Sequence, residues 1–403
     1  MRLDLELLRR LQHPADTKIV LLVMDGLGGL PGPDGLTELE AAATPNLDAL
    51  ARAAACGLHV PVGSGIAPGS GPAHLALFGY DPLRYQVGRG ALSALGVGFP
   101  LGPTDIAARG NFCTVDEHGN VTDRRAGRIA TELAAELCRH LAQNVTVPGV
   151  EVFVQAEKDY RFLLVLRGAH LSEAITETDP QVEGAPPLAS EPLVLEAAAT
   201  ARAVNTFAEE ARRLLADRRE ANMVLLRGFA KRPDWPQFED VYGVRAAAIA
   251  GYPMYRGVAR LVGMDVLEAP DDFGAELDVL ASNWGDYDYF YVHVKRIDSA
   301  GEDGDFARKA SLIGEVDQLV PRITSLQPDV LVVTGDHSTP STLRRHSAHP
   351  VPVLLWSRSG RPDRVERFGE RDCMTGALGP RLPAQELMPL ALAEAGRLDK
   401  FGA

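Results

Sequence analysis

The chain has 403 residues, of which 46% are hydrophobic and 24% charged, a composition that is typical of a globular protein and excludes a disordered or fibrous chain. The formal net charge of −13 argues against binding to nucleic acid or to a membrane surface, because both need a basic face. No apolar run approaches the ~18 residues of a membrane span, and the N-terminus does not read as a signal peptide, so we expect a cytoplasmic protein.

The first segments of the chain predict a helix, a strand and a second helix. Leucines at helical spacing indicate a short amphipathic helix over residues 3–12, and an apolar β-branched run indicates a strand over residues 19–24. Thr44 and Pro45 form a start signal for the second helix, with Thr44 as its cap. Residues 61–72 then form a loop rich in Gly, Pro and Ser, after which helical character resumes.

From about residue 105 the pattern changes to one of hairpins. Residues 111–122 and 150–167 each contain two β-rich runs around a polar turn, which is the signal of an antiparallel pair. The remaining elements expected here are a long loop over residues 176–193, a helix over 196–216 and a strand over 223–227.

After residue 244 the alternation of strands and helices returns. Strands are predicted over residues 245–250, 289–294 and 330–333, with a helix from about residue 256. The fold class is therefore α/β, with a central, mostly parallel sheet and an inserted α+β domain. The core domain is predicted to comprise residues 1–104 and 245–403, and the inserted domain residues 105–244.

Three of the apolar runs end in acidic residues. Asp25, Asp298 and the pair Asp336-His337 each follow a predicted strand. Because parallel strands place their carboxyl ends at one edge of a sheet, we expect these side chains to lie together. Carboxylates and imidazoles suit Mn²⁺, Zn²⁺ or Mg²⁺. Taken singly, each acid is also consistent with a position in a turn or in a solvated loop.

Ser70 is the candidate nucleophile. It has glycine on both sides, which leaves its hydroxyl open, and it precedes a helix N-terminus, a natural anion site. Pro68 and Pro72 exclude the elbow of serine hydrolases, but a metal ion can activate a serine without a triad. No P-loop is present, and Pro31 stands where a dinucleotide fingerprint needs glycine, so no nucleotide cofactor is expected.

Several basic residues are further candidates. Lys295 ends an otherwise apolar strand, and His346 lies in a polar loop where simple exposure is the alternative. Arg124, Arg125 and Arg128 form a cluster that reads either as a solvated helix face or as a clamp on phosphate and carboxylate groups.

These motifs occur almost from end to end of the chain. The sequence resembles the archaeal-type, 2,3-bisphosphoglycerate-independent phosphoglycerate mutases of the alkaline phosphatase superfamily. The resemblance implies an alkaline-phosphatase-like core with two divalent metals, and a phosphoserine intermediate in the interconversion of 3- and 2-phosphoglycerate in glycolysis and gluconeogenesis, with no need for added 2,3-bisphosphoglycerate. The segments that carry it include LLVMDGLGG, PGSGPAHLALFGYDP, DRRAGRI, HVKRIDSAG and TGDHSTP.

The resemblance also implies roles for individual residues, and it implies that the inserted domain clamps the substrate and excludes water. One metal is expected to be held by Asp25, Ser70, Asp336 and His337, and the other by Asp298, Glu302 and His346. The catalytic residues are expected to be Ser70 and Lys295. The residues expected to contact the substrate are His74, Arg124, Arg125, Arg128 and Lys295.

Two positions depart from the family pattern. Glu302 replaces the histidine of the usual A-G-H-D-G, and His349 replaces the aspartate of the usual H-S-x-D-P-V-P. We expect either that Glu302 binds the second metal through oxygen or that His349 supplies the lost imidazole. An oxygen ligand favours Mn²⁺ or Mg²⁺, with Zn²⁺ or Co²⁺ as alternatives.

Three other interpretations stay open on the sequence alone. The core motifs do not separate a mutase from a metal-dependent phosphatase, or from a phosphomutase for another small metabolite. The replaced histidine also allows a catalytically silent binding protein. The sequence leaves homo-oligomerisation undecided.

Overall fold

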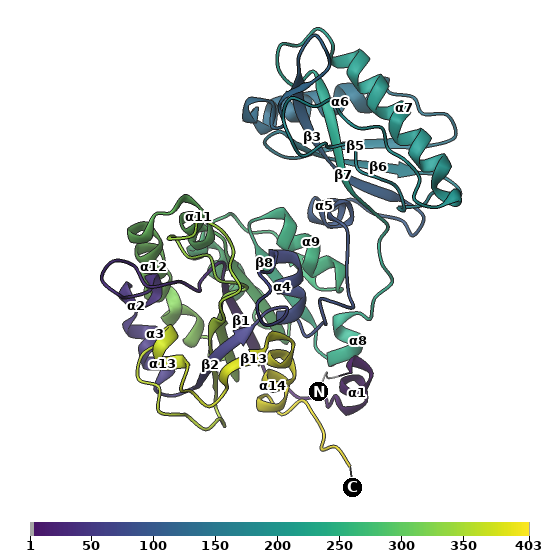
Figure 1. The fold of residues 1–403 in the computed structure, drawn as a ribbon. Coiled ribbons are helices and arrows are strands. Elements are labelled where there is room, and N and C mark those ends of the chain that lie inside the picture. Colours follow the sequence, from purple (N-terminus) through teal and green to yellow (C-terminus); the bar gives the residue numbers. More distant parts are fainter. Residues whose placement is uncertain (1–3, 403) are drawn as a thin grey trace. The chain divides into compact units, whose positions relative to one another are not determined.

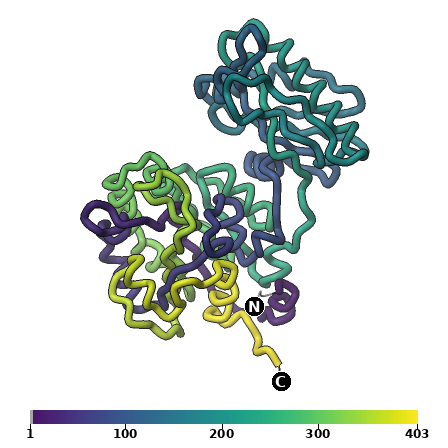
Figure 2. Tube along the Cα trace, in the orientation of Figure 1, coloured from purple at the N-terminus to yellow at the C-terminus, as the bar shows by residue number. Residues whose placement is uncertain are grey.

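The computed structural model describes residues 4–402, which divide into two compact units. Residues up to Gln86 and from Trp235 onward form the first unit, and Val87–Asp234 form the second. Figure 2 shows that the two ends of the chain belong to the same unit. No helix within residues 4–402 is both long and apolar enough to cross a membrane.

The first unit is built on an eight-stranded sheet (Figure 1). In sheet order its strands are β13 (Gly379–Pro383), β2 (Ala55–Val60), β12 (Val351–Ser357), β11 (Val330–Thr334), β1 (Ile19–Met24), β10 (Tyr289–Val294), β8 (Ala246–Ala250) and β9 (Asp265–Leu267). β1 pairs in parallel with both β10 and β11. Of these eight strands only β12 runs in the opposite direction, so the sheet is mostly parallel.

Helices cover both faces of this sheet. In chain order they are α1 (Leu5–Leu11), α2 (Glu38–Ala41), α3 (Pro45–Ala51), α4 (Ser70–Leu77), α8 (Phe238–Tyr242), α9 (Pro253–Leu261), α10 (Phe273–Ser282), α11 (Arg296–Asp303), α12 (Phe306–Thr324), α13 (Glu370–Cys373) and α14 (Leu387–Glu394). Val20 of β1 shares one apolar core with Leu312 of α12, whereas Leu21 faces Leu77 of α4 and Met388 of α14. A strand buried on both faces is apolar throughout, which explains the sequence of β1.

The second unit is an antiparallel sheet with helices on both faces. Its strands are β3 (Ile106–Val115), β4 (Val121–Asp123), β5 (Glu151–Lys158), β6 (Arg161–Arg167) and β7 (Met223–Ala230), and its helices are α5 (Arg89–Gly96), α6 (Thr131–Asn144) and α7 (Ala198–Leu215). α6 and α7 bury Leu137 and Phe207 against Phe162. On the other face, Ala91 of α5 packs against Leu163.

The structure confirms the α/β class, the mostly parallel sheet and the two predicted hairpins, β3–β4 and β5–β6. The limits of the units differ from the predicted residues 105 and 244. α5 packs on β3 and β7, so the second unit already begins at Val87. α8 packs on α1, so the chain has returned to the first unit at Trp235.

Smaller predictions differ from the structure at helix ends. Thr44 occupies the N-cap position of α3, but its side chain makes no capping hydrogen bond, so that prediction is wrong. α9 begins at Pro253 rather than near residue 256, because proline suits the first turn of a helix. The predicted N-terminal helix is α1; residue 3 lies outside the described residues.

Candidate active site

The three acid-ended strands bring their carboxylates to one edge of the sheet. Met24 lies opposite Val294, and Val23 opposite Thr334, so β1, β10 and β11 end at the same level. Asp25, Asp298 and Asp336 follow these ends, and all three are fully buried. Gly26 has a φ of +68°, and a Cβ there would lie 2.8 Å from Asp298 Oδ1, so only glycine lets the loop after β1 approach this acid.

His337 lies at the centre of these acids. Its Nε2 atom is 3.0 Å from Asp336 Oδ2 and 3.6 Å from Asp25 Oδ1. Asp336 is held in place by the backbone N–H groups of Gly26 and His337, which donate to its Oδ1 at 3.0 and 2.9 Å. The predicted neighbours Asp25, Asp336 and His337 therefore form one buried group.

Ser70 begins α4 and reaches the same group. Its Oγ atom is 3.1 Å from His337 Nε2. His74, one turn later, places Nδ1 2.8 Å from the Ser70 carbonyl and 3.4 Å from Asp336 Oδ2. His74 has no exposed surface, and burial lowers its pKa to about 4. His74 therefore packs against Ser70 and Asp336 inside the first unit, and its predicted contact with the substrate stays a prediction.

Asp298 and His346 form a second group beside the first. His346 Nε2 lies 3.7 Å from Asp298 Oδ1, and its ring stacks on that of His337 with 3.6 Å between centroids. Glu302 reaches this group from α11, with Oε1 3.8 Å from His346 Nε2. His349 is exposed, and its Nδ1 lies 2.9 Å from Ser347 Oγ. Of the two expected replacements, the geometry favours Glu302.

Lys295 links the two groups. Its Nζ atom is 3.2 Å from Asp25 Oδ2 and 2.5 Å from Asp298 Oδ2. Burial alone would lower the pKa of Lys295, but these two carboxylates raise it, so the ammonium group is charged. Burial and Asp336 would raise the pKa of Asp25, but Lys295 and His293 outweigh them and lower it.

Two residues that the sequence analysis does not single out also bind Asp25. The Tyr255 hydroxyl of α9 donates to Asp25 Oδ2, and His293 Nε2 of β10 lies 3.1 Å from the same oxygen. Both side chains are buried. A histidine within the apolar run YFYVHV was the signal for His293, whereas nothing in the sequence near Tyr255 points to this contact.

The two groups suit divalent metals. One ligand atom each from Asp25, Asp336 and His337, and likewise from Asp298, His337 and His346, lie within 4.8 Å of one another. Asp25 Oδ1 is buried but accepts no hydrogen bond, which is costly unless a cation binds it. Burial alone would lower the pKa of His337, but Asp336 and Asp25 raise it to about 9, so the site favours a positive charge at this ring.

The second unit holds a separate, strongly basic pocket of about 180 Å³. Its lining residues are Arg89, Arg109, Asn111, Arg124, Arg125, Tyr160, Arg161 and Arg227. Asp179 accepts hydrogen bonds from Arg124 at 2.8 Å and from Arg227 at 3.2 Å. Burial and then the neighbouring Arg227 and Arg109 lower the pKa of Arg89. A pocket in which guanidinium groups outnumber the acids that pair with them is suited to phosphate or carboxylate.

The predicted arginine cluster is therefore divided. Arg124 and Arg125 line the pocket, whereas Arg128 is exposed and is not among its lining residues. The alternative of a solvated helix face is wrong, because Ala126–Arg128 form a single 3-10 turn after β4. The sequence analysis misses Arg89, Arg109, Arg161 and Arg227, which lie on α5, β3, β6 and β7.

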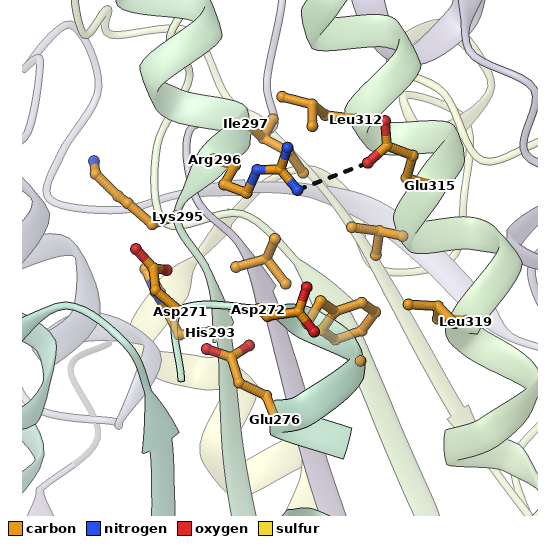
Figure 3. A pocket seen from close by; sticks show the side chains of 14 residues that line it. Asp271, Asp272, Glu276, His293, Lys295, Arg296, Ile297, Leu312, Glu315 and Leu319 are labelled. Atoms are coloured by element: carbon orange, nitrogen blue, oxygen red, sulfur yellow. Dashed lines mark ion pairs between the residues drawn. The ribbon is translucent and has the colours of Figure 1, made fainter. Parts of the chain in front are cut away.

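A further cavity of about 90 Å³ lies beside Lys295 and His293 (Figure 3). Acidic residues Asp271 and Glu276 line it, and the Arg296–Glu315 ion pair, at 3.8 Å, borders it. Glu276 is 2% exposed; burial and then Asp271 raise its pKa to about 9. Its carboxyl group is therefore neutral at pH 7.

Replacement of Glu276 by glutamine is expected to flatten the dependence of stability on pH. The carboxyl group ionises near pH 4.5 in the unfolded chain and near pH 9 in the folded one. Its contribution is therefore fully present below pH 4.5 and is lost as the pH rises toward 9, by at most about 1.4 kcal/mol per unit. Urea unfolding at pH 5, 7 and 8.5 measures this. Parallel profiles for wild type and Glu276→Gln would contradict the raised pKa.

The fold and the site together define a class: an α/β protein with two adjoining groups of acids and histidines that could hold metal ions at the carboxyl edge of its sheet, and a serine between them. The family model described as 2,3-bisphosphoglycerate-independent phosphoglycerate mutase matches residues 51–220. A protein from Thermus thermophilus named probable 2,3-bisphosphoglycerate-independent phosphoglycerate mutase is 51% identical over 401 residues, covering 98% of each chain. A protein of the same name from Thermotoga neapolitana is 50% identical over 390 residues, covering 96% of each.

Solved structures agree with these relatives. The cofactor-independent phosphoglycerate mutase from Thermoplasma acidophilum is 31% identical, with a TM-score of 0.73 over 94% of this chain and 100% of that one. A protein from Pyrococcus horikoshii is 30% identical, with a TM-score of 0.84 over 96% and 99%. The chain belongs to the 2,3-bisphosphoglycerate-independent phosphoglycerate mutase family, whose members are isomerases that transfer a phosphoryl group within one substrate.

Proposed function

We propose that this protein interconverts 3-phosphoglycerate and 2-phosphoglycerate in the cytoplasm, through a phosphoserine at Ser70. The observation that carries the proposal is the position of Ser70 Oγ, 3.1 Å from His337 Nε2 at the meeting point of the two groups of acids and histidines. Relatives of about half identity over nearly the whole chain support the same substrate. The cytoplasmic location is proposed because the substrate belongs to central carbon metabolism.

In the first half-reaction, Ser70 Oγ bonds to phosphorus as the bond from phosphorus to the substrate oxygen breaks. The serine proton ends on the substrate hydroxyl, which leaves phosphoserine and glycerate. The other glycerate hydroxyl then attacks the phosphoserine, and the proton exchange runs in reverse. Lys295, whose charge is fixed by Asp25 and Asp298, is placed to offset charge on the phosphoryl oxygens.

Two divalent ions are part of the proposal. Asp25, Ser70, Asp336 and His337 would hold one, and Asp298, Glu302 and His346 the other. When bound, the ions supply positive charge to the phosphoryl oxygens and lower the pKa of the serine hydroxyl. The oxygen of Glu302 makes Mn²⁺ or Mg²⁺ the proposed metal, because these ions prefer oxygen ligands more than Zn²⁺ does.

The guanidinium groups of the second unit are proposed to bind the anionic groups of phosphoglycerate. Arg89, Arg125 and Arg161 carry most of this role, because Arg124 and Arg227 already pair with Asp179 and Arg109 lies 3.5 Å from Glu157. Arg128, which is not among the lining residues, is proposed to add only long-range charge. A unit that holds glycerate between the two half-reactions would exclude the water that turns a mutase into a phosphatase.

An enolase-coupled assay on metal-stripped protein tests the function. Mn²⁺, Mg²⁺, Zn²⁺ and Co²⁺ are restored one at a time, with 3-phosphoglycerate as substrate and no 2,3-bisphosphoglycerate. Metal-dependent formation of 2-phosphoglycerate is the expected result. Release of inorganic phosphate without 2-phosphoglycerate would instead assign a phosphatase.

Replacement of Glu302 by histidine is expected to shift metal preference toward Zn²⁺ and away from Mn²⁺ by about 10-fold, because nitrogen replaces oxygen at the second site. Competition between the two ions, followed by metal analysis of the recovered protein, measures the ratio. His349→Ala is the matched control, and it should leave the ratio unchanged, since that ring contacts Ser347. An unaltered ratio in Glu302→His would remove Glu302 from the metal site.

A further inference from the structure

Thr339 contacts both metal-binding groups at once. Its Oγ1 atom donates to Asp298 Oδ1 at 2.7 Å and lies 3.0 Å from His337 Nδ1. Asp298 belongs to the group with His346, whereas His337 also belongs to the group with Asp25 and Asp336. Thr339 is fully buried, so no solvent molecule competes for its hydroxyl.

The hydrogen bonds that Thr339 can make determine which nitrogen of the His337 ring carries a proton. A threonine hydroxyl carries one hydrogen, and an ionised carboxylate can only accept. The hydrogen therefore points to Asp298, and the oxygen must accept from His337 Nδ1–H. With Nδ1 bound to Thr339, Nε2 is the ring nitrogen that remains for a metal ion, which would take the place of a proton there. Nε2 is the atom that faces Ser70 Oγ and the carboxylates of Asp25 and Asp336.

Thr339 is itself held by a buried lysine. Lys309 Nζ, from α12, donates to the Thr339 carbonyl at 2.9 Å and to the Gly28 carbonyl at 3.0 Å. The lysine is fully buried, with Glu38 Oε1 4.0 Å away. It therefore ties the loop after β11 to the loop after β1. On the other side, a Cβ at Gly301 would lie 2.3 Å from the Thr339 carbonyl, so glycine lets α11 bring Asp298 within reach.

We propose that Thr339 is a positioning residue that sets the ligand atoms of both metal sites, by fixing the His337 tautomer and by orienting Asp298. The inference rests on the two-metal part of the proposed function. It adds that a single hydroxyl, which is not itself among the proposed metal ligands, governs the affinity of both sites. Outer hydrogen bonds of this kind change metal affinity by about 10- to 100-fold.

Two substitutions separate the hydroxyl from the shape of the side chain. Thr339→Val keeps the volume and removes the hydroxyl, whereas Thr339→Ser keeps the hydroxyl. Titration of metal-stripped protein with Mn²⁺, and separately with Zn²⁺, by calorimetry or chelator competition gives the affinity of each site. Thr339→Val should weaken both sites by about 10- to 100-fold, and Thr339→Ser should retain wild-type affinity for both. Circular dichroism of the metal-free variants checks that each is folded.

A second measurement does not depend on a variant. In the wild-type protein loaded with Zn²⁺, the ¹⁵N spectrum of the histidine rings should show the His337 proton on Nδ1, hydrogen-bonded and protected from exchange. A proton on Nε2 would overturn the proposal, and so would wild-type affinities in Thr339→Val. If wild type binds two metals and Thr339→Val binds both more weakly, the role of Thr339 is upheld even when no mutase activity is found. The test of Thr339 can therefore fail or succeed independently of the proposed reaction. A wild-type protein that binds no metal would overturn both.

Discussion

Ser70→Ala is expected to lower the mutase rate by about 10³-fold or more and to abolish the phosphorylated enzyme. The substitution removes the oxygen that bonds to phosphorus, and no water molecule can replace it without releasing phosphate instead of transferring it. Ser70 stands at the start of α4, with its Oγ atom beside His337, so alanine fits the helix without new contacts. The enolase-coupled assay measures the rate, and mass spectrometry of acid-quenched protein measures the phosphoserine.

Ser64→Ala is the matched control, because Ser64 is an exposed serine in the loop that leads into α4. It should have wild-type activity and the same phosphorylated peptide as the unaltered enzyme. Substantial mutase activity in Ser70→Ala, or a phosphoryl group found on another residue, would assign the nucleophile elsewhere.

Arg89→Gln is expected to raise KM for 3-phosphoglycerate by about 10- to 100-fold, the effect of removing one charge-assisted hydrogen bond from a bound anion. Stability should not fall, because Arg89 is crowded by Arg227 and Arg109 and its replacement relieves repulsion. Steady-state kinetics gives KM, and thermal unfolding gives the stability.

Arg139→Gln controls for the loss of one positive charge from the same unit, since Arg139 is exposed on α6 and is absent from the pocket lining. It should leave KM unchanged. Equal effects of the two substitutions would mean that overall charge, and not the pocket, attracts the substrate.

The carboxyl edge of the first unit is largely predictable from sequence. β1, β10 and β11 are short apolar runs, each followed by an acid, and parallel pairing places such acids together wherever they lie in the chain. Ser70 follows from its glycine neighbours. The burial of a single side chain cannot be predicted in this way. His74 lies four residues after Ser70 on the same helix, and only the packing of α4 shows that its ring is buried.

The basic pocket depends on strand register, which single residues do not reveal. Arg109 of β3 lies opposite Arg227 of β7, and Asn111 lies opposite Arg161 of β6. These residues are far apart in sequence and carry no local motif, in contrast to the cluster around Arg124. The buried Lys309 is missed for a different reason: a lysine on a helix such as α12 ordinarily predicts an exposed face.

The order in which the chain leaves the ribosome matters for this topology. β1 lies between β10 and β11, so its neighbours are made only after more than two-thirds of the chain has been synthesised. Val87–Asp234, by contrast, is continuous and has its own apolar core. The second unit can therefore complete its sheet while β1 still exposes two unpaired edges, a state prone to aggregation. We expect the first segments of the nascent chain to need protection by a chaperone. We also expect the second unit, Val87–Asp234, to fold before the first.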